Sequence, residues 1–248
     1  MARDNTVMLV GRLSKPTVSF IEDYGTFKVA FTMTVLRNNK RIDYPKVVVY
    51  GLTETKAREI WSEMKEGKIA IVRGMITTKL RTKRMICPEC GCETEFPQLQ
   101  TEVVAFAPPI ILHEDYSPAK FVEISNNVNL LGEVCSQVQT RANCTLYQLA
   151  VERRFYVKEQ GPETRRDVPW IKSFSDIGKE DSMRLSPGSV VYITGALQTR
   201  NVDRLINCNN AGCSGQLSYK ETMHEIITSR VEYLHNCDFS ENNFDIEE

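Results

Sequence analysis

The sequence predicts an all-β protein built from two similar domains, for three reasons. An internal repeat recurs with a shift of 121 residues: Gly67-Lys-Ile-Ala-Ile-Val-Arg-Gly74 returns as Gly188-Ser-Val-Val-Tyr-Ile-Thr-Gly195. Both copies consist mainly of short, β-branched and partly alternating segments, which are typical of strands. Each copy has one helical segment, between its third and fourth strands. A repeat of this length is a duplicated domain rather than a solenoid unit, so each copy must bury its own core.

In the first copy, the expected strands are 5–13, 27–37, 46–50, 68–80 and 101–107. Residues 53–66 have a helical period instead, with Thr53 or Thr55 as the N-cap and Gly67 after the end. One apolar helix face is expected to pack in the core, and it consists of Ala57, Ile60, Trp61 and Met64. Three strands, a helix and two further strands form the element order of an OB-fold, a five-stranded barrel.

The second copy repeats this order, with strands expected near 127–134, 144–153, 168–174, 189–199 and 223–232. Its helical region, 176–187, is short, and one or two turns are expected. The predicted domains are a first OB-fold with a cysteine knuckle over 1–112, a linker over 113–125, a second such OB-fold over 126–236, and an acidic flexible tail over 237–248.

Composition is that of a globular protein, with 42% hydrophobic and 25% charged residues in 248. No apolar run is long enough for a membrane span, and the N-terminus lacks the apolar core of a signal peptide, so a cytoplasmic protein is expected. In that compartment eight cysteines favour metal binding over disulfides. Cys135 and Cys144, in or beside strands, are interpreted as small buried hydrophobic residues.

Charge is unevenly distributed. Residues 1–112 carry 17 Lys and Arg against 12 Asp and Glu, whereas residues 113–248 carry 14 against 20. Five acids fall within the last 11 residues, together with Phe239, Phe244 and Ile246. This end is either a solvated terminus or a peptide that recruits other proteins and competes for the basic surface of the chain.

Several stretches resemble the bacterial single-stranded-DNA-binding protein family, in the same order and spacing in both copies. They are Asn5-Thr-Val-Met-Leu-Val-Gly11-Arg-Leu, Val47-Val-Val-Tyr50-Gly51, Lys65-Glu-Gly67-Lys-Ile-Ala-Ile-Val-Arg-Gly74, Thr101-Glu-Val-Val104, Leu149-Ala150-Val151 and Gly195-Ala-Leu-Gln-Thr-Arg200. The chain departs from the family by its cysteines between the last two strands and by a tail that lacks the terminal Pro-Phe. Its two domains per chain occur in some members.

The resemblance implies sequence-independent binding and protection of single-stranded DNA, in replication, repair, recombination or mobile-element transfer. It places stacking aromatics at Tyr44, Tyr50 and Phe155, and it aligns Phe174 with Tyr50. Tyr50 alternates with Val49, so one of the two faces the core, whereas Trp61 is assigned to the core. The candidate nucleic-acid-binding residues are Tyr44, Lys46, Tyr50, Lys79, Arg81, Lys83, Arg84, Arg153, Arg154, Phe155, Trp170, Lys172, Phe174 and Arg200.

Four cysteines are candidate metal ligands. Cys87-Pro-Glu-Cys90-Gly has the form of a zinc knuckle, and Cys208-Asn-Asn-Ala-Gly-Cys213 is a looser second half. A closed structural zinc site takes four ligands, so one site shared by these two loops, with about one zinc per chain, is the economical interpretation. Separate sites completed by Cys92, His224 or the pair His235 and Cys237, a site between chains, and the absence of metal are the alternatives.

No enzyme is expected, because the three histidines are scattered and no catalytic motif is present. An OB-fold scaffold or adaptor of a replication or transcription assembly, and an RNA-binding protein, are the alternative functions. A homo-oligomer, with a dimer favoured, and replication or repair proteins bound to the tail are the expected partners besides DNA.

Overall fold

The computed structural model describes residues 4–22, 25–37, 41–112, 125–157 and 161–239, without the side chains of 154–163. The fold is all-β, as predicted, with two short helices among the described residues. No helix in this part of the chain combines the length and apolarity of a membrane span. The expected linker lies outside the description except for Ser125.

The chain forms two compact units. The smaller unit comprises Met1–Asn5, Asn129–Ala196 and Ile226–Glu248, and the larger unit comprises Thr6–Val128 and Leu197–Glu225. Part of the second copy therefore belongs to the same unit as the first copy.

In the larger unit, five strands of the first copy pair in a closed circle. They are β1 (Asn5–Leu13), β3 (Thr26–Leu36), β5 (Lys46–Leu52), β7 (Glu93–Ala105) and β6 (Ile69–Ile86), which returns to β1. Alternate residues of these strands are buried inside, among them Leu9, Met33 and Val103. Three short strands flank the circle: β2 (Thr17–Ile21) and β4 (Ile42–Asp43) pair with β3, and β8 (Ile110–Ile111) pairs with β6.

Helix α1 (Glu54–Glu63) begins where the sequence predicts, because the Thr53 side chain accepts a hydrogen bond from the backbone N–H of Lys56. Ala57, Ile60 and Met64 are buried, as the predicted apolar face requires. The assignment of Trp61 to the core is wrong, since 47% of it is exposed. Its indole N–H donates to the carbonyl of Pro16 at 3.3 Å, which holds the ring along the surface.

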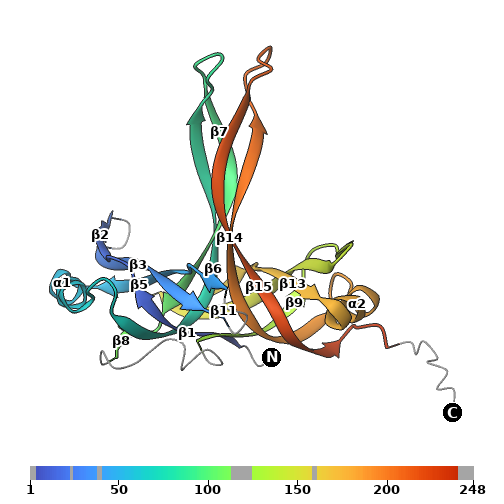
Figure 1. The fold of residues 1–248 in the computed structure, drawn as a ribbon, viewed down its shortest axis with the longest axis horizontal. Coiled ribbons are helices and arrows are strands. Elements are labelled where there is room, and N and C mark those ends of the chain that lie inside the picture. Colours follow the sequence, from blue (N-terminus) through green and yellow to red (C-terminus); the bar gives the residue numbers. More distant parts are fainter. Residues whose placement is uncertain (1–3, 23–24, 38–40, 113–124, 158–160, 240–248) are drawn as a thin grey trace. The chain divides into compact units, whose positions relative to one another are not determined.

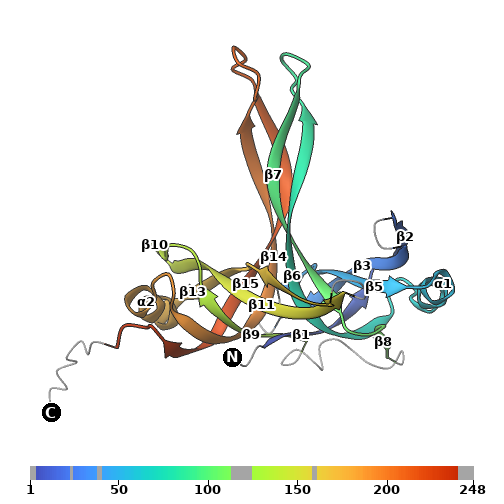
Figure 2. The same cartoon turned by 180° about the vertical axis from the view of Figure 1, so that it is seen from behind.

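The strands before and after the cysteines are longer than predicted. β6 and β7 pair continuously from Gly74 opposite Ala105 to Ile86 opposite Glu93. In the second copy, β14 (Val190–Asn207) and β15 (Gln216–His235) form the corresponding hairpin. We call residues 77–102 the first arm and residues 197–225 the second arm. Both belong to the larger unit, where they run side by side (Figures 1 and 2).

Two glycines fix the equivalence of the two hairpins. A side chain at Gly74 would collide with the carbonyl oxygen of Val104, and one at Gly195 would collide with that of Ile227. Only glycine permits so close an approach of two backbones. Val104 therefore corresponds to Ile227, a shift of 123 residues, on the returning strands.

In the smaller unit, the strands of the second copy also close a circle. It runs through β9 (Asn126–Val134), β11 (Cys144–Val157), β13 (Trp170–Phe174), β15 and β14, and β14 pairs with β9. The strands β10 (Gln139–Arg141) and β12 (Gly161–Asp167) pair with β11.

Helix α2 (Ser175–Arg184) has 10 residues and is longer than the one or two turns predicted. Its buried Asp181 accepts hydrogen bonds from the hydroxyl groups of Ser173, Tyr147 and Tyr233. These hydrogen bonds attach the helix to the strands, although the helix buries only Gly178 and Asp181 and no large apolar side chain. Sequence periodicity does not report such a polar anchor.

The first residues of the predicted tail contact α2. The backbone N–H of Asp238 donates to the carbonyl of Arg184 at 2.9 Å, and the Arg184 guanidinium lies 5.2 Å from the ring centre of Phe239. Residues 240–248 lie outside the description.

Candidate nucleic-acid interface and cysteine cluster

Tyr44 and Lys46 lie at the edge of the first circle, at the start of β5. Tyr44 is 52% exposed, as expected for a stacking residue. Its backbone N–H donates to the hydroxyl of Thr199 at 2.7 Å, so the second arm fixes the backbone beneath the ring. The Lys46 ammonium lies 3.9 Å from Glu102 and is partly exposed.

Tyr50 is part of a polar cluster around the buried Glu102. Its hydroxyl donates to a Glu102 carboxylate oxygen at 2.6 Å. The Lys79 ammonium lies 3.4 Å from the same oxygen and 4.7 Å from the centre of the Tyr50 ring. Tyr50 is half-buried and Val49 is buried, so Val49 is the one of the two that faces the core. Only part of this ring is accessible for stacking.

The basic run at the end of β6 lies along the first arm. Arg81 is exposed, Lys83 lies 4.1 Å from the ring centre of Tyr219, and Arg84 pairs with Glu95 at 2.6 Å. Exposed ion pairs of this kind contribute little and are screened by salt, so they leave the guanidinium available to a polyanion.

In the second copy, Trp170, Lys172 and Phe174 share one face of β13, because the intervening Ile171 and Ser173 are buried. The Lys172 ammonium lies 5.3 Å from the ring centre of Phe174, which is 39% exposed. This face carries two aromatic rings with a cation between them.

The other candidates of the second copy differ in accessibility. Arg153 forms an ion pair at 2.5 Å with Asp167, a carboxylate that is 1% exposed. The guanidinium of Arg200 makes two hydrogen bonds, of 2.8 and 3.0 Å, to the buried carboxylate of Glu225. Arg154 and Phe155 lie on β11, and their side chains are outside the described part of the chain.

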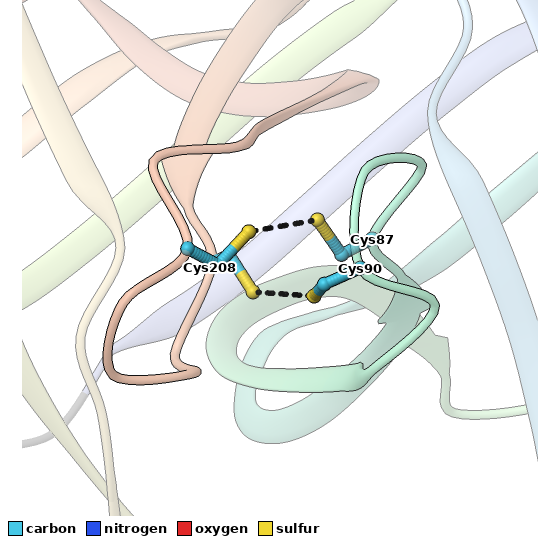
Figure 3. A group of neighbouring side chains, drawn as sticks. Cys87, Cys90 and Cys208 are labelled. Carbon is cyan, nitrogen blue, oxygen red and sulfur yellow. Dashed lines mark hydrogen bonds between the residues drawn. The ribbon is translucent and has the colours of Figure 1, made fainter.

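The structure brings together the four cysteines that the sequence singles out. The sulfur atoms of Cys87, Cys90, Cys208 and Cys213 all lie within 4.8 Å of one another. Cys87 and Cys213 are 3.8 Å apart, and Cys90 and Cys208 are 3.6 Å apart. In Figure 3, Cys87 and Cys90 reach from the loop of the first arm toward Cys208 on the facing loop. Tetrahedral zinc with bonds of about 2.3 Å requires sulfur atoms about 3.8 Å apart, so this donor set fits zinc.

Polar groups around the cluster orient the sulfurs. The buried Thr94 hydroxyl donates to Cys208 at 3.6 Å, and the backbone N–H of Gly215 donates to Cys213 at 3.4 Å. The backbone N–H of Cys92 is the main cause that lowers the pKa of Cys90 to about 6. Hydrogen bonds of this kind favour thiolate, the form that binds metals.

Gly215 allows the two loops to meet. A side chain at this position would lie 2.8 Å from the sulfur of Cys87 and 3.1 Å from Glu89. Of the alternative ligands, Cys92 accepts a hydrogen bond from Asn210 at 3.4 Å, and its sulfur is not one of the four.

Cys135 is exposed and Cys144 half-buried, so the assignment of Cys135 to the core is wrong. Cys135 directly follows the last residue of β9, where the alternation of the strand no longer applies.

Sequence analysis missed Glu102 and Glu225, and it considered His224 only as an alternative metal ligand; His224 is not in the group of four. The two glutamates correspond under the shift of 123 residues, and each forms an ion pair with a cation of the other strand of its arm, Lys79 or Arg200. This repeat of an acid and a cation is the signal that could have found them. His224 lines a cavity of about 630 Å³, together with Tyr44 and Lys46.

No protein-family model matches the chain, and no curated protein matches its sequence. Solved structures that share its fold include two forms of one protein. The wild-type single-stranded DNA binding protein from Thermus aquaticus matches with a TM-score of 0.62 and 15% identity over 94% of each chain. A deletion mutant of that protein matches with a TM-score of 0.60 and 15% identity over 100% of each chain. Both neighbours are forms of a single-stranded DNA binding protein.

Proposed function

We propose that this protein binds single-stranded DNA without strong sequence preference, and that each copy is an OB-fold. The observation that carries the proposal is the aromatic and basic face of β13, with Trp170, Lys172 and Phe174 in alternation. Such a face offers flat rings to bases and a cation to the backbone. Tyr44 and Lys46 supply a second, smaller face of the same kind.

The fold supports this proposal. The similarity to the two forms of the Thermus aquaticus protein covers 100% and 94% of this chain. At 15% identity the likeness concerns the fold, so the function depends on the residues of this chain.

Two tryptophans make a direct test possible, because the chain contains only Trp61 and Trp170. Trp61→Phe leaves Trp170 as the single indole, and Trp170→Phe leaves the helical Trp61. We expect dT oligomers to quench the fluorescence of the first variant and not of the second. Quenching in neither variant, together with no shift in anisotropy of labelled dT, would exclude the proposal.

Salt and strand type complete the test. Because cations release counterions from the strand, affinity for dT should fall steeply as salt rises. Equal affinity for duplex and single strand would favour a scaffold with a nonspecific basic surface. Stronger binding to single-stranded RNA of matched length would favour the RNA-binding alternative.

We further propose that Cys87, Cys90, Cys208 and Cys213 hold one structural zinc ion, which clamps the loops of the two arms. Bound zinc would supply no chemistry beyond this cross-link, since four thiolates close its coordination sphere. Two observations support the proposal. Gly215 allows the two loops to approach closely, and the hydrogen bonds donated to Cys208 and Cys213 favour the negatively charged thiolates that bind zinc.

Metal analysis of purified protein should give about one zinc per chain. Cys208→Ser with Cys213→Ser should lose it, whereas Cys92→Ser is the matched control and should keep it. A stoichiometry near two, or retention in the double variant, would show that the loops do not share a site. Gly215→Ala should weaken zinc binding although it removes no ligand.

We also propose that the acidic end recruits replication or repair proteins and that the protein is a homo-oligomer. Because Phe239 contacts Arg184, truncation should begin after Phe239 rather than after Cys237. Removal of residues 240–248 should leave stability unchanged and abolish capture of the partner proteins. Sedimentation with and without dT would test for the dimer.

A further inference from the structure

A fifth thiol lies beside the four cysteines of the proposed zinc site. Cys92 is exposed, and a single glycine separates it from Cys90 in the sequence Cys90-Gly91-Cys92. Its sulfur is not one of the four that lie within 4.8 Å of one another, so it remains available as a thiol when those four bind zinc. The proposed zinc clamp therefore leaves one cysteine of the first arm without a role.

The loop of the first arm holds Cys92 against Cys90. The backbone N–H of Cys87 donates to the carbonyl of Cys92 at 2.9 Å, and the N–H of Gly91 donates to the carbonyl of Cys87 at 2.9 Å. Gly91 has a φ of +71°, a left-handed conformation that favours glycine. This turn brings the side chains of Cys90 and Cys92 together, and they share a hydrogen bond. Asn210 of the facing loop donates to the Cys92 sulfur at 3.4 Å and fixes its position.

Solvent reaches this pair more easily than the rest of the cluster. Cys90 and Cys92 are both exposed, whereas Cys87 is buried and Cys208 and Cys213 are half-buried. A small oxidant such as hydrogen peroxide therefore meets the Cys90 sulfur first. Oxidation of a cysteine follows its exposure, and a second thiol beside the oxidised one converts the sulfenic acid into a reversible disulfide. Cys92 has the position of that second thiol.

We propose that Cys90 and Cys92 are a redox-active dithiol, which hydrogen peroxide converts into a disulfide. This inference rests on the proposed zinc clamp, because the clamp explains why Cys92 and not Cys208 is the available thiol beside Cys90. It gives the first loop a site of reversible modification in addition to its metal ligands.

The reaction takes two steps. The Cys90 thiolate attacks one oxygen of the peroxide, so that an S–O bond forms, the O–O bond breaks and hydroxide leaves. The Cys92 sulfur then attacks the sulfenic sulfur of Cys90, so that the S–S bond forms and the S–O bond breaks. The departing hydroxide takes the proton of Cys92 and leaves as water. The two sulfurs together lose two electrons, and the peroxide gains them.

The disulfide withdraws Cys90 from the group of four. A closed structural zinc site needs four ligands, so zinc is released and the loops of the two arms lose their clamp. Reduced glutathione in excess restores both thiols by exchange, and the four ligands are complete again. Without Cys92, the oxidised Cys90 lacks its resolving thiol and proceeds to sulfinic acid, which thiols do not reduce. The pair therefore makes the loss of the clamp reversible.

Peptide mapping tests the pair directly, because trypsin separates the two loops. One tryptic peptide, 85–120, contains the three cysteines of the first loop, and another, 205–220, contains the two of the second. Zinc-loaded protein is treated with hydrogen peroxide, and the remaining thiols are alkylated before digestion. Peptide 85–120 should lose two hydrogen atoms and carry an alkyl group on Cys87 alone, whereas peptide 205–220 should be alkylated on both cysteines. A chromogenic chelator should report zinc release in the same reaction.

Cys92→Ser separates the redox role from a structural one, because it removes the resolving thiol and no zinc ligand. The variant should bind zinc like the native protein and release it under peroxide, but the release should be permanent. Cys90 should gain two oxygen atoms, and glutathione should no longer restore zinc binding. Cys135→Ser removes an exposed cysteine outside the two loops, so it is the matched control and should recover like the native protein.

The outcomes distinguish the dithiol from the clamp. Reduced protein that binds no added zinc would refute the clamp, and the mass of peptide 85–120 would still test the dithiol. A disulfide of Cys90 with Cys208, which joins the two peptides, or with Cys87 would overturn the inference and leave the zinc site intact. Recovery of zinc binding by Cys92→Ser as complete as that of the native protein would overturn it as well.

Discussion

Both arms bury a glutamate at the same position of their returning strands, but they neutralise it with different partners. Glu102 receives the hydroxyl of Tyr50 and the ammonium of Lys79, whereas Glu225 receives two donors from Arg200. The residue aligned with Tyr50 in the second copy is Phe174, which has no hydroxyl. Phe174 offers no hydrogen-bond donor where Tyr50 offers its hydroxyl. In the second arm the cation, Arg200, supplies two donors to the glutamate instead of one. Lysine and arginine are not interchangeable at such a site, since only guanidinium binds both carboxylate oxygens at once.

The largest effect is expected when the cation of each arm is removed. Arg200→Ala leaves Glu225, which is 1% exposed, without its bidentate partner. It should destabilise the protein by about 2–4 kcal/mol, less than the about 3–5 kcal/mol for a fully buried pair, because solvent screens the partly exposed guanidinium. Lys79→Ala should cost about half as much, because Tyr50 and Lys46 still face Glu102. Urea unfolding measures both, and an equal loss would contradict the comparison.

The elements of the two copies could be predicted from the sequence, but the length of the arms could not. Three features follow from local signals in the sequence. The N-cap residue Thr53 predicts the start of α1, and the alternation of apolar residues predicts the order of the strands. The repeat, together with the spacing of a zinc knuckle, predicts that the two cysteine loops meet. The sequence predicts arms that are too short, because residues 81–86 include three charged residues, none of the six is buried, and they therefore lack an apolar alternation. Pairing with the returning strand, a long-range interaction, holds them extended.

The candidate site shows the same limit. Tyr44 was predicted to be exposed from its polar neighbours, and its ring is exposed. The cavity beside Tyr44 could not be predicted, since it depends on Thr199 and His224, residues of the second copy that line it with Tyr44 in the larger unit. Nothing local in the sequence distinguishes His224 from a solvated histidine.

The aromatic faces provide the next test of the comparison. Trp170→Ala should weaken binding to dT by about 1–3 kcal/mol, and Tyr44→Ala should fall in the lower part of that range because its ring is smaller. Trp61→Ala, on α1, is the control and should leave affinity unchanged. Fluorescence anisotropy with labelled dT measures all three. A larger loss for Tyr44→Ala would make the first copy the principal binding surface.

The Tyr50 hydroxyl provides a smaller effect. Tyr50→Phe gives the first copy the aromatic residue of the second copy but leaves Lys79 in place. It should cost about 1–2 kcal/mol, since a hydrogen bond to a buried carboxylate is lost. Lys79→Arg in the same chain should recover part of this loss, because guanidinium supplies the second donor. Tyr44→Phe, whose hydroxyl belongs to an exposed ring, is the control. If the double variant is no more stable than Tyr50→Phe, the donors in the two copies are not interchangeable.

At neutral pH His224 gives the smallest expected effect, because its contribution appears only as a dependence of stability on pH below that range. The equivalent residue of the first arm is Thr101, which does not titrate. Burial and the nearby Lys46, opposed by Glu102, lower the pKa of His224 to about 4, against about 6.5 in the unfolded chain. Between these two pKa values the unfolded state binds a proton at His224 that the native state does not bind. The free energy of unfolding should therefore fall as the pH is lowered from about 6.5 to about 4. Above about pH 6.5 the protonation of His224 should not affect stability. His224→Gln should remove this contribution, and His235→Gln, at an exposed position, should keep it. Urea unfolding at a series of pH values measures the difference between variant and native curves, and parallel curves across the window would show that His224 is not buried as a neutral group.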